Sequence, residues 1–424
     1  MDSVLPLSDL PDSRLRGQRA LVSVDYNVPL NSEGEVSDAS RITATLPTLR
    51  RLVAAGARVV LVSHMGRPDG SPDPSLSLGP VVPILREELG VEVGFATERP
   101  GSPELSQRIE SLEDGEVVLL ENIRFQPGET ENDAELAESL GGLGDLFVGE
   151  AFGAAHRAQS SNVGAARIIR ERGGLAVAGT LMETELRFLS DALEHPSRPF
   201  VAVMGGAKIS GKIELIDAIL PRVDRLLVGG AMANTFFRAL GLETGASLVE
   251  VDRIDLAQEL MDRAGDKLLL PVDVVVATEI DASASTRSVD RSEVEESDRI
   301  ADIGPRTRSI FSRVLEDART VLWNGPMGVF EMTPFAEGTM QVAKSIAEAN
   351  DHGALTIVGG GDSAAAVADA RVLDRMSHVS TGGGASLDLL SGKSLPGVDA
   401  LSPAAEVDGS VDEGVESHGT QGDR

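Results

Sequence analysis

The chain has 424 residues, of which 42% are hydrophobic and 25% are charged, the balance of a globular protein rather than of a disordered or fibrous one. Its 38 Lys and Arg residues stand against 67 Asp and Glu, and the formal net charge of −29 argues against nucleic acid or an anionic membrane as the main partner. Cysteine is absent, which excludes disulfides, thiolate nucleophiles and zinc–thiolate or iron–sulfur sites.

The first part of the chain alternates short runs of valine and leucine with longer segments of helical spacing. Strands are predicted at 20–24, 59–63, 117–120 and 146–149. No apolar run approaches the ~18 residues of a membrane span, and residues 1–17 contain Asp2, Asp9 and Asp12 but no apolar core. We therefore expect neither a transmembrane helix nor a signal peptide, and a cytoplasmic protein.

The second part continues the alternation, with strands predicted at 200–204, 225–228, 267–271, 320–323, 355–358 and 378–381. Segment 181–194 has apolar residues at helical spacing and separates the two series, which predicts a helix between two domains. Because nearly continuous apolar strands are buried on both faces, the predicted fold class is α/β, with two doubly wound, Rossmann-like lobes of parallel sheet. Residues 281–299 are polar without a period and are expected to be a surface excursion. Residues 403–424 form an acidic tail that is expected to be disordered.

Glycine clusters follow four of the later strands, each ahead of a helical segment. Such glycines allow backbone N–H groups to approach phosphate oxygens at the start of a helix, at the carboxyl edge of the sheet where ligands gather. The alternative is that tight turns use glycine for packing alone, but four clusters in one half favour a phosphate-bearing ligand. The clusters are Gly205 and Gly206, Gly229 and Gly230, residues 359–361, and residues 382–384.

Polar and cationic side chains follow the earlier strands instead. In so acidic a chain, arginines that recur beyond successive strand ends predict one concave site for a small polyanion, because guanidinium binds phosphate and carboxylate as a bidentate fork. The alternative for any single arginine is a surface ion pair. The residues are Asp25, Asn27, Arg41, His64, Arg67, Asn122, Arg124, His156 and Arg157.

The segment GGAKISGK at 205–212 fits the phosphate-loop pattern G-x-x-x-x-G-K-[ST] except at its last position, where Ile213 cannot hold magnesium. The chain has only five lysines, yet Lys208 and Lys212 lie four residues apart here, which favours a role for both. Asp362 is the best candidate for a magnesium ligand, because magnesium prefers one or two carboxylates with phosphate oxygens and water. The alternative for Asp362 is the N-cap of the helix that follows.

The chain resembles the phosphoglycerate kinases over nearly its whole length, from about residue 19 to residue 402. The stretches that carry the resemblance occur in the order of the family. They are VDYNVP at 24–29, SHMGRPDG at 63–70, LLENIRF at 119–125, AFGAAHRAQSS at 151–161, GGAKISGK at 205–212, LWNGPMGVFE at 322–331, GGGDSAAA at 359–366 and HVSTGGGASLDLLSGKSLPGVDALS at 378–402.

The resemblance implies reversible transfer of the ATP γ-phosphoryl group to the carboxylate of 3-phosphoglycerate, with Mg²⁺ accompanying ATP or ADP. It implies that phosphoglycerate binds to Asp25, Asn27, Arg41, His64, Arg67, Arg124 and Arg157. It implies a nucleotide site of Gly206, Lys208, Lys212, Gly229, Gly230, Asn324, Pro326, Glu331, Gly360, Gly361, Asp362 and Ser363, with Glu331 on the ribose and Asp362 on the metal. Catalysis is expected from Arg41, Lys208, Gly382 and Gly383.

The family also implies a division of the chain. A phosphoglycerate lobe is expected at 1–178, an interdomain helix at 179–195, a nucleotide lobe at 196–385, and a segment at 386–402 that returns to the first lobe. Since the two substrates would bind to different lobes, in-line transfer is expected to require hinge closure. A monomer without nucleic-acid or membrane partners is expected. Two positions depart from the family: Ser23 replaces an arginine, and a lysine is replaced within Glu183 and Thr184.

Two other functions were open on the residues alone. A dehydrogenase would need G-x-G-x-x-G after its first strand, where this chain has residues 25–29 instead. A binding or scaffold protein could keep the fold without turnover, but the presence of Arg41, Lys208, Lys212 and Asp362 argues against it. Finally, an acidic, lysine-poor chain resembles proteins of salt-loving archaea, so folding and activity are expected to need high salt. The alternative is an ordinary acidic cytosolic protein.

Overall fold

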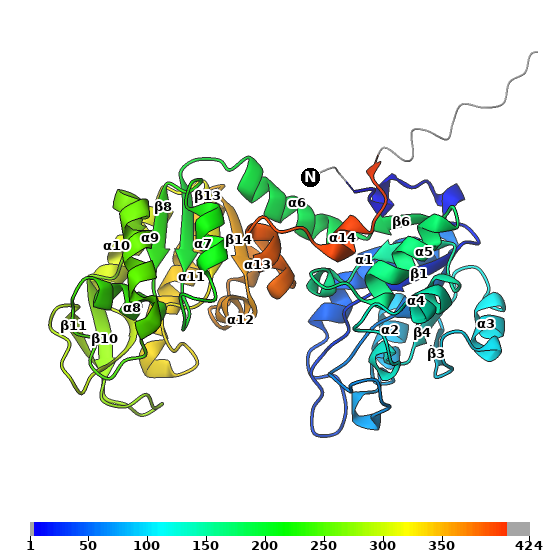
Figure 1. Ribbon diagram of the computed structural model, residues 1–424, viewed down its shortest axis with the longest axis horizontal. Coiled ribbons are helices and arrows are strands. Elements are labelled where there is room, and N and C mark those ends of the chain that lie inside the picture. Colours follow the sequence, from blue (N-terminus) through cyan, green and yellow to red (C-terminus); the bar gives the residue numbers. More distant parts are fainter. Residues whose placement is uncertain (1–3, 405–424) are drawn as a thin grey trace, which may run out of the picture. The chain divides into compact units, whose positions relative to one another are not determined.

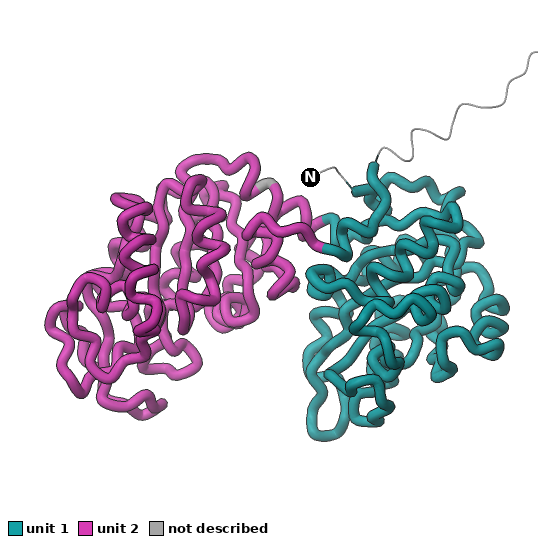
Figure 2. The backbone as a smooth tube through the Cα atoms, viewed as in Figure 1, with its two compact units in different colours: residues 1–183, 396–424 teal, residues 184–395 magenta. Residues whose placement is uncertain are grey.

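The computed structural model describes residues 4–404, which form two units (Figure 2). Unit 1 comprises the chain up to Glu183 together with the segment that begins at Pro396, and unit 2 is Thr184–Leu395. Helix α6, Thr180–Glu194, spans the boundary between them and confirms the helix predicted at 181–194. The chain re-enters unit 1 at Pro396, whereas the sequence placed this return at residue 386.

Unit 1 contains a six-stranded sheet in the order β3-β4-β2-β1-β5-β6, in which all neighbours are parallel (Figure 1). All residues of β4 and β5 are buried, as expected for strands covered on both faces. The four predicted strands are present within one residue, and β3 and β6 are additional. The strands are β1 Arg19–Ser23, β2 Arg58–Val62, β3 Val93–Ala96, β4 Val117–Leu120, β5 Leu146–Gly149 and β6 Leu175–Ala178.

Helix α1, Ser40–Ala55, packs Ile42, Leu49 and Leu52 into the core of unit 1. It ends at Gly56, whose left-handed conformation (φ +80°) lets its N–H donate to the carbonyl of Leu52. The other helices are α2 Val81–Leu89, α3 Pro103–Glu110, α4 Ala134–Gly141, α5 Ala165–Glu171 and α14 Pro396–Asp399, with short 3₁₀ turns that include Ile123–Phe125.

Unit 2 contains a second parallel sheet, in the order β15-β14-β13-β7-β8-β9. The six predicted strands are all present, although β9 and β15 are shorter than expected, and Lys267 belongs to the 3₁₀ turn before β9. The strands are β7 Phe200–Met204, β8 Arg225–Val228, β9 Leu268–Leu269, β13 Thr320–Asn324, β14 Leu355–Gly359 and β15 His378–Val379. The helices are α7 Ile213–Ile219, α8 Met232–Ala239, α9 Ile254–Ala264, α10 Pro305–Glu316, α11 Glu337–Asp351, α12 Gly361–Asp369 and α13 Gly384–Leu390.

The expectation that residues 281–299 form no element was wrong. Strand β11, Arg287–Asp290, pairs antiparallel with β10, Asp273–Ala277, which also pairs with β12, Arg299–Ile303. The guanidinium of Arg287 binds the buried carboxylate of Asp298 at 2.7 Å. Strand β11 lies at the edge of its sheet and is held by backbone hydrogen bonds and this ion pair. It therefore needs no apolar pattern, which is why it could not be predicted from the sequence.

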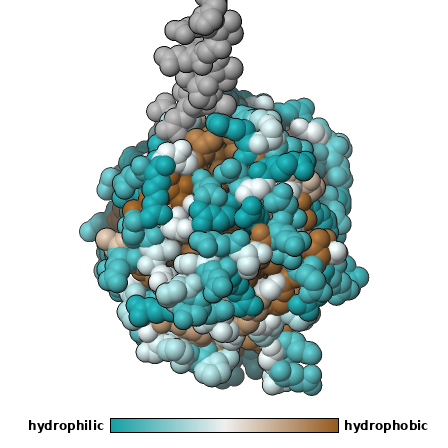
Figure 3. Space-filling view, turned by 90° about the vertical axis from the view of Figure 1, so that its right-hand side faces the viewer, coloured by the Kyte–Doolittle hydropathy of each residue, from teal (hydrophilic) through white to brown (hydrophobic). Residues whose placement is uncertain are grey.

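The expected disordered tail at 403–424 lies outside the described residues apart from positions 403 and 404. Within the described chain, no helix is both long enough and apolar enough to cross a bilayer. Figure 3 shows one face of the molecule, which is mainly hydrophilic with apolar residues scattered over it.

Candidate active site

The loops after β1 and β2 bring three of the predicted site residues together in unit 1. An Arg41 guanidinium nitrogen lies 2.8 Å from Asp25 Oδ2, and His64 Nε2 lies 3.9 Å from Asp25 Oδ1. These loops meet because β1 and β2 are adjacent and parallel, so that their carboxyl ends share one edge of the sheet. Asp25 therefore lies between the Arg41 guanidinium and the His64 imidazole, and it holds Arg41 in place through an ion pair.

The loop after β2 is fixed from both sides by neighbouring strand ends. The N–H of Gly66 donates to Asn27 Oδ1 at 2.9 Å, and an Arg124 guanidinium nitrogen donates to the carbonyl of Gly66 at 2.6 Å. Buried Asn122 bonds both the N–H and the carbonyl of Met65, at 3.1 and 2.7 Å. The predicted residues Asn27, Asn122 and Arg124 thus hold the His64 loop in one conformation.

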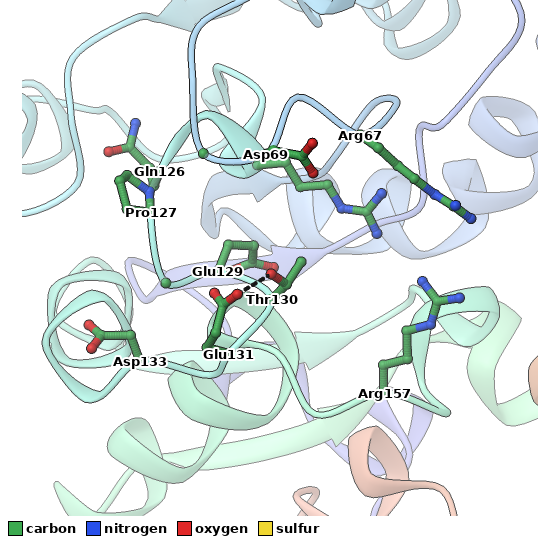
Figure 4. Close-up of a pocket in the computed structure, with 12 residues that line it drawn as sticks. Arg67, Asp69, Gln126, Pro127, Glu129, Thr130, Glu131, Asp133 and Arg157 are labelled. Carbon is green, nitrogen blue, oxygen red and sulfur yellow. Dashed lines mark hydrogen bonds between the residues drawn. The ribbon is translucent and has the colours of Figure 1, made fainter.

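Electrostatics show that the cations of unit 1 converge. Burial lowers the pKa of Arg124, and the nearby charges of Arg157 and Arg67 lower it further. These three arginines line a pocket of about 680 Å³. In Figure 4 the guanidinium groups of Arg67 and Arg157 lie on one side of this pocket and the carboxylates of Glu131 and Asp133 on the other. Carboxylates also line the pocket, but the guanidinium groups gathered on one side of it can bind a small anion there.

His64 lies within this field of positive charge. Burial lowers its pKa from 6.5 to about 4, Asp25 opposes the shift, and Arg124, Arg41 and Arg157 add to it. The imidazole is therefore neutral near pH 7 and can donate one hydrogen bond without adding a charge.

One residue that departs from the family pattern lies beside this cluster. Ser23 is the last residue of β1 and is buried, and its carbonyl accepts the N–H of Glu150 at 2.9 Å. A serine at this position supplies no positive charge, but position 23 is not among the residues that the resemblance assigns to phosphoglycerate binding.

In unit 2 the glycines that end β7 and β8 do not offer their N–H groups to a ligand. Gly205 donates to Asn324, Gly206 to Pro326 and Gly230 to Met327, all at 2.9–3.0 Å. Gly205 and Gly230 are needed instead for close backbone approach, since a Cβ on Gly205 would lie 2.0 Å from the carbonyl oxygen of Pro326 and one on Gly230 would lie 2.5 Å from the nitrogen of Gly206. Gly206 has φ +106°, a conformation that residues with a side chain rarely adopt. At these turns the glycines therefore serve the backbone structure of the protein rather than hydrogen bonding to a ligand.

Gly230→Ala should destabilise unit 2 by about 3 kcal/mol, the sum of a left-handed backbone penalty and an overlap in a packed region. Gly230 has φ +65°, and its Cβ would lie 2.5 Å from the nitrogen of Gly206. The urea midpoint of unfolding measures the effect. Gly211→Ala is the control, because a Cβ there meets no described atom within 4 Å. Equal midpoints for the two variants would contradict the close-approach interpretation.

The lysines of unit 2 occupy different environments. Lys208 is exposed, whereas Lys212 is partly buried and its Nζ donates to Asn324 Oδ1. Burial lowers the pKa of Lys212 to about 8, and the charge of Asp362 opposes this shift. Asn324 in turn donates to the carbonyl of Gly359 at 2.8 Å, which joins the ends of β13 and β14.

The start of α12 lies at the same edge of the sheet. Gly360 is its N-cap with φ +92°, and Ser363 accepts the N–H of Gly325 at 2.6 Å. Asp362 lies in the first turn with an exposed side chain, so Gly360, not Asp362, is the N-cap. Exposed Glu331 follows β13 in the same loop as Pro326.

The fourth glycine turn, residues 382–384, leads into α13. Gly382 donates to Ser380 Oγ at 3.1 Å, and Gly383 has φ +50° as the N-cap of this helix. The loop is tied to α6 by Glu185, a fully buried carboxylate that accepts the N–H of Thr381 at 2.8 Å and bonds His378 at 2.7 Å. Glu185 could not be identified from the sequence, because no motif or period links positions so far apart in the chain.

Two further glutamates behind the predicted residues were also missed. Glu129 is buried beside the arginine pocket, and its carboxylate accepts from the Ser161 hydroxyl at 2.5 Å and from the Ser161 N–H at 3.1 Å. Glu250 binds the segment that carries Lys208 and Lys212. Neither glutamate has a sequence signal, since acidic residues are abundant throughout the chain.

A metal ion at this site would depend on a single protein carboxylate. Within residues 4–404, no group of three or more His, Asp or Glu side chains is arranged to hold a metal. Asp362 is exposed and close enough to Lys212 to influence its pKa. It could supply the single carboxylate that magnesium commonly binds together with phosphate oxygens.

Comparison with known proteins gives a consistent result. The family model described as phosphoglycerate kinase matches residues 10–393. The phosphoglycerate kinase of Chloroflexus aurantiacus is 53% identical over 393 residues, which cover 92% of this chain and 97% of that protein. The enzyme of Thermus thermophilus is 54% identical over 389 residues, covering 91% and 97%. The structure of phosphoglycerate kinase from Coxiella burnetii superposes with a TM-score of 0.84 at 39% identity, covering 94% of this chain and 98% of that one.

Proposed function

The chain belongs to the phosphoglycerate kinase family, and on this premise we propose how its side chains divide the work of the family's reaction. The chain is a kinase that transfers the γ-phosphoryl group of ATP reversibly to the carboxylate of 3-phosphoglycerate. A carboxylate oxygen bonds to the γ-phosphorus while the bond from phosphorus to the bridging oxygen of ADP breaks. The products are 1,3-bisphosphoglycerate and ADP, and no general base is needed.

Unit 1 would bind phosphoglycerate. The observation that carries this assignment is the convergence of Arg41, His64 and Arg124 around Asp25 in a chain whose net charge is −29. Arginine forks match both the phosphate and the carboxylate of this substrate. The full proposed set is Asp25, Asn27, Arg41, His64, Arg67, Arg124 and Arg157.

Unit 2 would bind the nucleotide, and the bond between Lys212 and Asn324 at the glycine turns supports this assignment. Lys212 would meet the phosphates and Asp362 would hold Mg²⁺, which neutralises phosphate charge when it is bound. The glycines give the nucleotide room for close approach, and Glu331 would reach its ribose. The other proposed contacts are Gly206, Lys208, Gly229, Gly230, Asn324, Pro326, Gly360, Gly361 and Ser363.

Catalysis would rest on positioned charge. A highly anionic donor and a trianionic acceptor must be brought together, so charge on the moving phosphoryl group has to be met by fixed donors. We assign this role to Arg41 from unit 1 and to Lys208, Gly382 and Gly383 from unit 2. Since acceptor and donor bind to different units, turnover would require closure that excludes water.

The test is a coupled assay of ADP release with 3-phosphoglycerate and Mg–ATP, run from about 10 mM to several molar KCl. Release that depends on phosphoglycerate supports the proposal, and omission of phosphoglycerate is the control. Absence of turnover at every salt concentration would favour a scaffold protein instead. A monomeric state and a cytoplasmic location belong to the same proposal.

A requirement for salt is part of the proposal, and the charge of −29 with only five lysines supports it. The Debye length falls from ~30 Å at 0.01 M to ~3 Å at 1 M, so molar salt screens the self-repulsion of the folded chain. The unfolding temperature is therefore expected to rise steadily with KCl. Full stability at about 10 mM KCl would overturn this part alone, since the assignment as a phosphoglycerate kinase rests on other observations.

His64 should titrate near pH 4 in the free protein and at a higher pH when 3-phosphoglycerate is bound, because a polyanion favours the imidazolium. Binding then takes up a proton, so the affinity that His64 contributes should increase as the pH falls through the bound-state pKa. Imidazole NMR titrations of both states measure the shift, and the His64→Gln variant identifies the resonance. A pKa of about 6.5 in the free protein would contradict the expectation.

A further inference from the structure

The segment that carries the two lysines of unit 2, residues 205–212 (the lysine loop), is held by a carboxylate from another part of the chain. Glu250 Oε2 accepts the N–H groups of Ile209 at 2.6 Å and of Ser210 at 3.1 Å, and Glu250 Oε1 accepts the Ser210 hydroxyl. The N–H of Glu250 itself donates to Thr235 Oγ1 at 3.2 Å, which ties the glutamate to helix α8.

This arrangement differs from that of a phosphate loop, which the sequence of the lysine loop nearly matches. In a phosphate loop the backbone N–H groups cradle the phosphates of the nucleotide. Here the N–H groups of Ile209 and Ser210 are occupied by the carboxylate of Glu250, and that of Lys212 donates to the carbonyl of Ile209 at 2.9 Å.

The first two residues of the lysine loop are also committed within the protein, since their N–H groups donate to Asn324 and Pro326. Five N–H groups of the loop are therefore used internally. The loop also carries two ammonium groups that it can direct toward a ligand, and the position of these groups depends on what holds the backbone.

We infer that Glu250 is a positioning residue of the kinase reaction: its carboxylate takes the place that a phosphate occupies in a phosphate loop and so aims Lys208 and Lys212 at the nucleotide. This inference rests on the proposed function of the two lysines. Glu250 acts through the lysine loop and touches neither substrate.

Glu250→Ala leaves two N–H groups without their acceptor, so the lysine loop relaxes and its ammonium groups shift. A shift of about 1 Å at a reacting group costs about 10²-fold in rate. We therefore expect kcat/KM for Mg–ATP to fall about 10²-fold, while KM for phosphoglycerate, whose site is in unit 1, stays unchanged.

Glu250→Gln provides the conservative variant. Its Oε1 can accept both N–H groups, and its Nε2 can donate to the Ser210 hydroxyl, so the geometry persists without the charge. Hydrogen bonds to a charged acceptor are about twice as strong as those to a neutral one, so Glu250→Gln weakens the contacts without removing them. We expect its kcat/KM for Mg–ATP to fall only about 3- to 10-fold. Formate, a small carboxylate, should partly restore the Ala variant and leave the wild type unchanged.

The experiment measures kcat, both KM values, the unfolding midpoint and amide hydrogen exchange at Ile209 and Ser210, for the wild type, Glu250→Ala and Glu250→Gln. Glu243→Ala is the matched control, since this exposed glutamate lies in the same connection between α8 and α9 and its carboxylate pairs with Arg238 at 3.4 Å rather than with the lysine loop. Faster exchange at the two amides, the selective loss for Mg–ATP and the rescue by formate support the inference.

Two results would overturn it. Kinetics of Glu250→Ala within about twofold of the wild type would show that the carboxylate does not position the lysines. A lower unfolding midpoint with equal losses for both substrates and no rescue would show a purely structural role. If the wild type itself has no activity, the proposed function fails, but hydrogen exchange and calorimetric binding of Mg–ATP still test Glu250.

Discussion

Arg41→Ala is expected to lower kcat by about 10³-fold, with a smaller increase in KM for 3-phosphoglycerate. Arg41 lies at the start of α1, where Asp25 Oδ2 holds one guanidinium nitrogen at 2.8 Å and leaves 38% of the side chain exposed toward solvent. The remaining donors can thus meet the oxygens of the moving phosphoryl group. Removal of Arg41 also leaves Asp25 without its cation, and the unpaired carboxylate repels the anionic substrate, which explains the increase in KM.

Arg41→Lys should restore little activity, because a single ammonium group cannot reproduce the planar fork that binds Asp25 and phosphate together. Steady-state kinetics at saturating Mg–ATP measure the effect. Arg50→Ala is the control: Arg50 lies on the same helix, is exposed and pairs with Glu88 at 3.2 Å, so its removal changes the charge equally but not the site. Turnover of Arg41→Ala near that of Arg50→Ala would refute the role of Arg41.

The architecture could be predicted from the sequence where burial leaves a continuous apolar run. Strands such as β4 and β13 are buried along their whole length, so valine and leucine mark both their position and their bounds. Strand β3 escaped notice because Gly94 interrupts its apolar run and because it lies at the edge of its sheet, where its two middle residues are only partly buried. Strand β10 was overlooked although its valine run is buried along its whole length. Strand β11 has partly exposed, polar residues and is held by backbone pairing with β10, so it leaves no apolar period to find.

The site was predictable to the extent that parallel strands carry their ligand-binding loops at one edge. Asp25, Arg41 and His64 were expected together on that ground, and they lie together. The role of the glycine N–H groups was not predictable. Whether such a group donates to a ligand or to the protein itself depends on the acceptors that surround it in the folded chain. Glu250 was invisible for a related reason: its carboxylate reaches backbone groups 41 positions away, and no residue pattern records such a contact.

Lys208→Ala is expected to lower kcat by about 10³- to 10⁴-fold, with KM for both substrates changed only a few-fold, because this ammonium group would act mainly in the transition state. The two lysines of the loop should differ. Lys212 is tied to Asn324 and its pKa is lowered to about 8 by burial, which suits a fixed role in binding. Lys208 is exposed and able to follow the phosphoryl group as it moves. Lys212→Ala should therefore raise KM for Mg–ATP more than Lys208→Ala does.

Stopped-flow or steady-state kinetics measure these changes, with Lys344→Ala as the control for loss of an exposed lysine on α11. The sharper test is the variant that lacks both Arg41 and Lys208. If each side chain supplied an independent step, the two losses would multiply. The alternative is that Arg41 and Lys208 act as a unit on one phosphoryl group in a single transition state. In that case an enzyme that already lacks one of them gains little from the other. The double variant should then have a kcat only slightly lower than that of the slower single variant. If the two losses of kcat multiply fully, Arg41 of unit 1 and Lys208 of unit 2 do not stabilise the same phosphoryl group.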